Sequence, residues 1–117
     1  MPDTAIEIAR TIVEILEEKK GEDIVLLDLV DVSSFTDYFV ICSGGSDRTL
    51  KALGEEVRKQ MKQHHLIREV SVEGGSADGW VLIDYGDVIL HLFSIQLRQY
   101  YQLEDLWHEG KVLIRVQ

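Results

Sequence analysis

The chain has 117 residues, of which 45% are hydrophobic and 28% charged, and its formal net charge at pH 7 is −9. These totals describe one globular domain, and they exclude a disordered or fibrous chain and a second domain. The acidic balance argues against nucleic-acid phosphates as the main contact, because such binding needs clustered Lys and Arg. It favours a basic protein partner, although acidic charge also serves solubility alone.

The single cysteine, Cys42, excludes an internal disulfide and a multi-cysteine zinc site within one chain. It lies in an apolar strand, where a buried and inert thiol is expected. The amino end does not have the pattern of a signal peptide, and no stretch reaches the ~20 apolar residues of a membrane helix. We therefore expect no membrane association and a location in the cytoplasm, or in an organelle matrix after removal of a presequence.

Hydrophobic periodicity predicts alternating helices and strands. The first helix begins with the capping-box spacing of Thr4 and Glu7 and ends at Gly21, after two lysines. The expected elements are a helix over 4–20, strands over 24–32 and 38–42, a helix over 47–63, a strand over 67–72, hairpin strands over 80–84 and 88–93, and a helix after 93. The order αββαββα or αββαβββα predicts an α/β (α+β) domain with a mixed sheet of about five strands and helices packed on it.

The stretch over 79–93, GWVLIDYGDVILHLF, is the expected centre of this sheet. A glycine-containing turn between two β-favouring runs predicts a hairpin, with a two-residue turn at Tyr85-Gly86. Because side chains alternate across a strand, the hairpin has two unlike faces. The aliphatic face, which should pack under helices, would carry Val81, Ile83, Val88, Leu90 and Leu92. The other face, which we call the mixed face, would carry Trp80, Leu82, Asp84, Asp87, Ile89, His91 and Phe93.

The last ten residues are separated from this pattern. We expect a single domain over 1–107 and a C-terminal extension over 108–117. Within the extension, residues 112–116 could add an edge strand or lie loosely on the surface.

Enzyme chemistry has weak support in the sequence. A strand, Gly44-Gly45-Ser46 and a helix could hold a phosphate on backbone amides, but the lysine of a phosphate-binding loop is missing and a tight turn needs glycine in any case. No Asp-x-Asp pair follows to hold the metal ions of a nucleotidyltransferase. A hydrogen-bonded pair of His91 and Asp87 is conceivable, yet no nucleophile accompanies it. The residues favour a binding module over an enzyme, with no metal and no cofactor.

The helix expected over 47–63 carries the only concentration of basic residues in this acidic chain, namely Arg48, Lys51, Arg58, Lys59 and Lys62. Such a run is usually a solvated helix face, and the alternative is a site for an acidic partner.

Several motifs, taken in order, resemble the ribosomal silencing factor family, also called the Iojap family. They are SSFTDYFVICSG, Glu73-Gly74, GWVLIDYGDVILHLF, and Arg98 followed by YYQLEDLW. The resemblance covers nearly the whole chain, from about Thr4 to Trp107. The family's fold is similar to a nucleotidyltransferase without its catalytic carboxylates.

The resemblance implies a translation regulator. It implies binding to a basic ribosomal protein, the one numbered fourteen, on the intersubunit face of the large subunit, which blocks joining of the small subunit. It also implies action in starvation or in large-subunit maturation, and homodimers in some members. The residues that match the family are Asp37, Trp80, Leu82, Asp84, Gly86, Asp87, His91, Arg98, Tyr101 and Trp107; those we expect to bind the partner are Trp80, Leu82, Asp84, Asp87, His91, Arg98 and Tyr101.

Overall fold

The fold is a six-stranded mixed sheet with helices on both faces. The structure, a computed structural model, describes residues 4–101 and 110–116, without the side chains of Tyr100 and Tyr101. Its elements are α1 (Ala5–Glu18), β1 (Glu22–Asp28), β2 (Tyr38–Gly44), α2 (Asp47–His65), β3 (Ser71–Gly75), the short 3-10 helix η1 (Ser76–Asp78), β4 (Trp80–Asp84), β5 (Val88–Ser94), α3 (Ile95–Tyr101) and β6 (Lys111–Val116).

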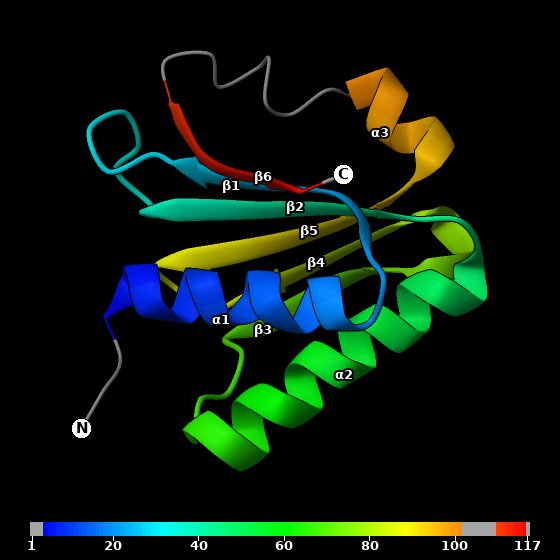
Figure 1. The fold of residues 1–117 in the computed structure, drawn as a ribbon, viewed down its shortest axis with the longest axis horizontal. Helices are drawn as coiled ribbons and strands as arrows, with labels where there is room; N and C mark the ends of the chain where they lie inside the picture. The colour runs from blue at the N-terminus through cyan, green and yellow to red at the C-terminus, as the bar shows by residue number, and fades with distance from the viewer. Residues whose placement is uncertain (1–3, 102–109, 117) are drawn as a thin grey trace.

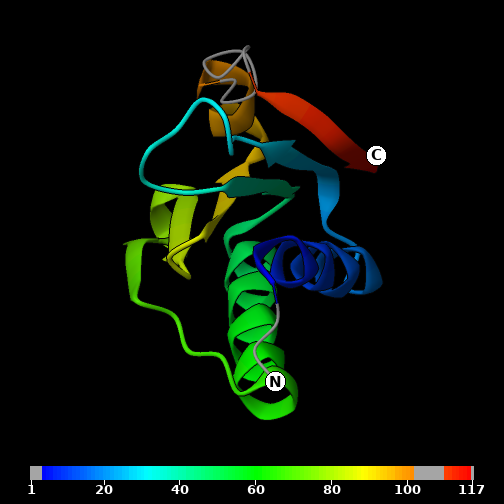
Figure 2. The same cartoon turned by 90° about the vertical axis from the view of Figure 1, so that its left-hand side faces the viewer.

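The strand order in the sheet is β3-β4-β5-β2-β1-β6. The central strands β2 and β5 are parallel, and all the other pairs are antiparallel. Helices α1 and α2 cover one face, and α3 lies over the other (Figures 1 and 2). The predicted mixed α+β sheet is confirmed, with one strand more than the five expected.

The additional strand is β6. It pairs antiparallel with β1, from Ile24 opposite Val116 to Asp28 opposite Lys111. Of the two alternatives for residues 112–116, the structure therefore has the edge strand. Pairing with β6 occupies backbone groups of β1 that would otherwise form the open edge of the sheet.

The aliphatic face of the hairpin forms the main core, as the alternation predicts. Ile83, Val88, Leu90 and Leu92 are fully buried, and Val81 is nearly so. They pack in one cluster with α1 and α2 side chains that include Ile12, Leu16, Leu50, Leu53, Val57 and Met61. Each such side chain contributes about 1.5–3 kcal/mol by leaving water, so this layer supplies much of the stability.

Both long helices begin at hydroxyl caps. The Oγ1 of Thr4 accepts a hydrogen bond from the Glu7 N–H at 3.4 Å, and the Oγ of Ser46 accepts one from the Thr49 N–H at 3.1 Å. Ser46 thus closes the turn into α2. Helix α2 ends at His65, two residues later than predicted, and its C-cap Leu66 has a left-handed backbone.

The strand predicted over 67–72 is displaced along the chain. Just after α2, the Ile67 N–H still bonds to the Met61 carbonyl of the helix. The following residues, up to Val70, connect the helix to the sheet. The Val70 N–H bonds to the Asp84 carbonyl, and β3 starts at Ser71. The glycines after Val72, which suggest a loop in the sequence, instead pair with Val81 and Trp80 as part of β3.

The hairpin turn is one residue away from its predicted position. The Tyr85 N–H bonds to the Val88 carbonyl at 2.8 Å, so the two turn residues are Gly86 and Asp87 rather than Tyr85 and Gly86. Gly86 has φ +90°, which suits the first position of a type II′ turn. The two faces keep their predicted residues, but the cross-strand neighbours change: Trp80 lies opposite Phe93, and Leu82 lies opposite His91.

Gly86→Ala should lower the free energy of unfolding by about 1–2 kcal/mol, because an L-residue at this φ is strained. A Cβ at this position would contact nothing within 4 Å, so no collision contributes. The matched control is Asp87→Ala, at an exposed turn position without a positive φ, which should change stability by less than about 0.5 kcal/mol. Urea unfolding measures both, and equal losses would contradict this turn.

Candidate functional site

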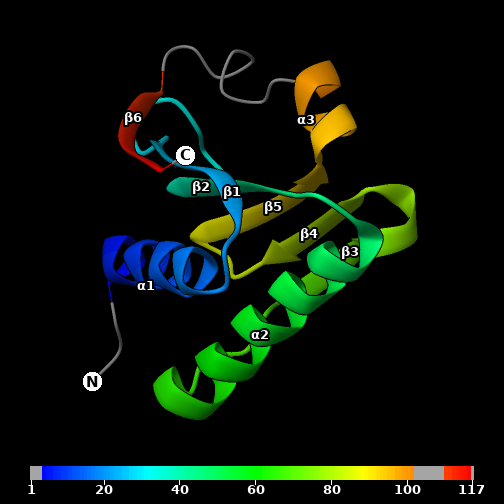
Figure 3. The ribbon, with the colours of Figure 1, turned by 45° about the vertical axis from the view of Figure 1, so that its right-hand side comes forward.

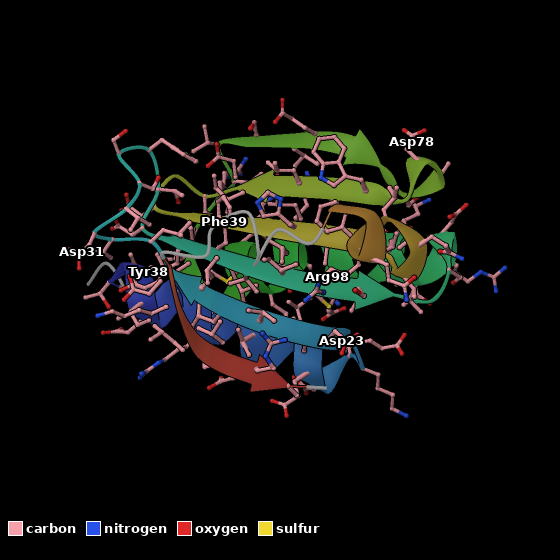
Figure 4. The ribbon with its side chains drawn as sticks, turned by 90° about the horizontal axis from the view of Figure 1, so that it is seen from above. Asp23, Asp31, Tyr38, Phe39, Asp78 and Arg98 are labelled. Carbon is pink, nitrogen blue, oxygen red and sulfur yellow. The ribbon has the colours of Figure 1, made fainter. Side chains whose placement is uncertain are left out.

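The mixed face is the side of the sheet turned away from α1 and α2, and Figure 4 looks onto it. It has its own core, which the sequence does not reveal. Ile89 and Phe93 of β5 are buried there with side chains of β1 and β2 that include Val25, Leu27, Phe39 and Ile41. Trp80 and Leu82 of β4 pack against this cluster but stay half-buried. The face therefore divides into a buried β5 row and a partly exposed β4 row.

Trp80 is positioned by a glycine on the neighbouring strand. Gly74 has φ +78°, and a Cβ added to it would lie 2.6 Å from Cε3 of the Trp80 indole. Only glycine leaves room for the ring to lie against β3 at this point. This contact explains why the Glu73-Gly74 motif accompanies Trp80 in the sequence.

Acidic groups border the exposed β4 row at its turn end and along β3. Asp84 is half-buried on β4, and its Oδ1 accepts a hydrogen bond from the Gly86 N–H at 2.7 Å. Asp87 is exposed in the turn, and its carbonyl accepts hydrogen bonds from the N–H groups of Asp37 and Tyr38. Glu73 on β3 is exposed directly opposite Leu82. We call Glu73, Asp84, Asp87 and Asp37 the acidic rim.

Two rim residues are absent from the set expected to bind the partner: Asp37, which the sequence gives only as matching the family, and Glu73. In the sequence Glu73 precedes two glycines and suggests a loop. Its place on the mixed face follows from the β3 register, which pairs it with Leu82. The Glu73-Gly74 motif is the signal that could have found it.

His91 lies beside Leu82 on the neighbouring strand β5, and it is buried rather than exposed at the surface. Its side chain is 8% exposed, its ring centroid is 4.5 Å from that of Phe39, and it stacks on Phe93 at 6.0 Å. Among the described residues neither ring nitrogen has a hydrogen-bond partner, so the conceivable pair with Asp87 is not formed. Burial lowers the pKa of His91 to about 4, and at neutral pH the ring is an uncharged member of the aromatic cluster.

Arg98 ties α3 to the sheet. Arg98 is 8% exposed, and its Nη1 donates a hydrogen bond to Oγ of Ser43 on β2 at 3.0 Å. Figure 4 shows Arg98 reaching from α3 toward β2, with Phe39 on the same face. Ser43, which is almost fully buried, is a second residue that the sequence pattern does not single out.

Two of the family-matched residues lie partly or wholly outside the described part of the structure. Tyr101 is the last residue of α3, and its side chain lies outside the described part of the structure. Trp107 lies outside the described residues altogether.

The turn Gly44-Gly45-Ser46, which the sequence suggested could hold a phosphate, connects β2 to α2 and caps the helix. Gly44 is buried, and a Cβ on it would lie 2.9 Å from Cδ2 of Leu50; Ser46 caps α2. Burial raises the pKa of the Cys42 thiol to about 12, so it is protonated at neutral pH. The described residues contain no group of three or more His, Cys, Asp or Glu placed to hold a metal ion, and none of their helices is long and apolar enough to cross a membrane.

A family model described as ribosomal silencing factor during starvation matches residues 2–117. The chain belongs to the ribosomal silencing factor family. The ribosomal silencing factor RsfS of Bacillus subtilis is 41% identical over 94 residues, which are 80% of this chain and 79% of the relative. The family name describes regulation of the ribosome rather than a catalysed reaction.

Two further relatives support this assignment. A crystal structure of a protein from Chromobacterium violaceum matches with a TM-score of 0.85 at 35% identity, over 91% of this chain and 88% of that chain. The mouse protein named mitochondrial assembly of ribosomal large subunit protein 1 is 36% identical over 99 residues, which are 82% of this chain but 43% of the relative. The resemblance drawn from the sequence motifs is confirmed.

His91 should make stability depend on pH. In the unfolded chain its pKa is near 6.5, so between pH 6.5 and 4 the unfolded state binds a proton that the folded state does not. The free energy of unfolding should therefore fall by about 3 kcal/mol from this residue as the pH drops through that window. His91→Phe should lose this contribution. Urea unfolding at several pH values measures the difference, and parallel profiles for the two proteins would contradict a neutral buried ring.

Proposed function

We propose that this silencing factor binds a basic protein of the large ribosomal subunit through the β4 row of its mixed face. The family resemblance points to the ribosomal protein numbered fourteen on the intersubunit side. Bound there, the factor would block joining of the small subunit and so repress translation. The observation that carries the proposal is the half-exposed pair Trp80 and Leu82 inside the acidic rim.

The chemistry of this surface suits a protein partner. Interfaces use a few aromatic or aliphatic anchors that lose water on binding, surrounded by polar groups that supply specificity. Trp80 and Leu82 are such anchors, and the acidic rim matches a basic surface. His91 and Phe93 lie beside them as buried cross-strand neighbours on β5, so each anchor packs against a fixed side chain and loses less freedom on binding.

We also propose where and when the factor acts. The factor acts as a binding protein rather than an enzyme, in the cytoplasm, when nutrients are short or while large subunits mature. The printed name of the mouse relative, which refers to assembly of the large subunit, supports that subunit as the target. Of the other residues expected to bind, His91 and Arg98 support the surface from within.

Replacing both anchors should strongly weaken binding. Trp80→Ala with Leu82→Ala should weaken the affinity for purified large subunits about 30-fold or more, because a truncated anchor typically costs about 2 kcal/mol. Co-sedimentation with large and small subunits measures the loss, and circular dichroism checks the fold.

The matched control removes apolar groups from the opposite edge of the sheet. Val112 and Leu113 of β6 are 46% and 44% exposed, and Val112→Ala with Leu113→Ala should leave co-sedimentation unchanged. If the anchor variant stays folded and binds like the wild type, the assigned surface is wrong.

The acidic rim should act on the rate of association. Glu73→Gln, Asp84→Asn and Asp87→Asn together should slow association with large subunits several-fold at low salt and leave dissociation nearly unchanged, because exposed charges steer encounter. The difference should disappear near 0.5 M salt, where the charges are screened.

The control for the rim removes three carboxylates from the exposed side of α1. Glu14→Gln, Glu17→Gln and Glu18→Gln change the net charge equally on the other layer of the molecule. Stopped-flow kinetics distinguish the two variants. Equal association rates for both would show that net charge alone, not the rim, determines the rate.

A further inference from the structure

Positive charge is concentrated in one segment of this acidic chain. Residues 47–69, which hold α2 and its connection to β3, contain six of the 12 Lys and Arg residues but four of the 21 acids. The rest of the chain is therefore strongly negative, and this segment is positive. We call its Arg48, Lys51, Arg58, Lys59, Lys62 and Arg68 the basic stripe.

Helical geometry aligns the stripe. The five basic residues of α2 recur at intervals of three, seven, one and three, which places them on one side of the helix; the buried Leu50, Leu53, Val57 and Met61 lie on the other. From Arg48 to Lys62 the stripe is about 21 Å long at 1.5 Å per residue. All six basic residues are exposed. The carboxyl end of α2 projects beyond the sheet (Figures 1 and 3).

A polar hollow lies at the carboxyl end of the stripe. It has a volume of about 410 Å³ and is lined only by charged side chains, namely Glu55, Arg58, Lys59, Lys62, Arg68 and Glu69. Nη2 of Arg58 pairs with Oε1 of Glu69 at 2.7 Å, which holds the connection against α2. Within the described part of the chain, Lys59, Lys62 and Arg68 form no salt bridge. Their charges are available to an anion.

The lining of the hollow indicates which anionic partner fits. An acidic protein would need apolar anchors to gain affinity, and no apolar side chain lines the hollow; the exposed Leu66 and Val70 lie in the chain on either side of Arg68, outside the lining. A nucleic-acid backbone needs only cations, because its affinity comes largely from release of counterions at the phosphates. A member of a ribosomal family meets RNA phosphates in abundance. We propose that the basic stripe binds the phosphate backbone of ribosomal RNA.

This contact is separate from the proposed protein contact. The stripe lies on the α2 layer, and the acidic rim lies on or beside the opposite face of the sheet. The negative remainder of the chain repels phosphates, so RNA is confined to the stripe and its binding is weak. RNA thus orients the factor, while the mixed face remains available for the main contact. The inference does not depend on the proposed function, because RNA alone can test it.

The test measures binding to large-subunit ribosomal RNA freed of protein, by filter binding at 50–200 mM salt. Lys59→Gln, Lys62→Gln and Arg68→Gln together should weaken binding and reduce the slope of log affinity against log salt by roughly two to three units, since each phosphate contact contributes about 0.7–0.9. The control variant Lys19→Gln, Lys20→Gln and Lys111→Gln has the same net charge and should keep the wild-type slope.

Two results would overturn the inference. Equal slopes for the two triple variants would mean that no localised stripe exists. If the stripe variant loses affinity for whole large subunits while wild-type protein does not bind the free RNA, the stripe meets an acidic ribosomal protein instead. Because Trp80 and Leu82 are intact in every variant, failure of either proposal leaves the other unaffected.

Discussion

The architecture depends on the parallel pairing of β2 with β5. These two strands are far apart in the sequence, and parallel strands cannot be joined by a tight turn. The chain between them forms α2, β3 and β4; β4 pairs with the outer side of β5, and β3 pairs with the outer side of β4. The same pairing sets Ile41 beside His91 and Val40 beside Leu90, which fixes the residues beneath and above the central sheet.

The two faces of this sheet then acquire different uses. On the aliphatic face α1 and α2 bury almost every apolar side chain, and that layer holds the fold together. On the mixed face Phe39, His91 and Phe93 form a smaller core, and Arg98 fastens α3 above it through Ser43. The packed β5 row supports Trp80 and Leu82, which remain partly exposed because only edge strand β3 lies beyond them.

Charge follows the same division into layers. The acidic rim borders the mixed face, whereas the basic stripe lies along α2 on the other layer. The two surfaces that we propose for a basic protein and for phosphates therefore belong to different layers of the domain.

The sequence by itself determined the features that depend on local periodicity and local capping. Alternation along 80–93 assigned Trp80 and Leu82 to one face of the sheet and Ile83 and Leu90 to the other. The predicted turn was one residue away from the observed one, but both turns have two residues. Each side chain therefore keeps its predicted face. Thr4 marked the start of α1. The motifs also identified the family correctly.

Only the tertiary structure decided the features that need distant segments. The hydrogen bonds from Asp37 and Tyr38 to the Asp87 carbonyl help to hold the turn at Gly86 and Asp87, and Phe39 from a strand about fifty residues earlier buries His91. Residues 111–116 form the strand β6 because the backbone groups on the outer side of β1 pair with them. Glu73 belongs to the acidic rim because the register of β3 on β4 places it opposite Leu82. In each case the deciding partner lies far along the chain, where a local pattern carries no information about it.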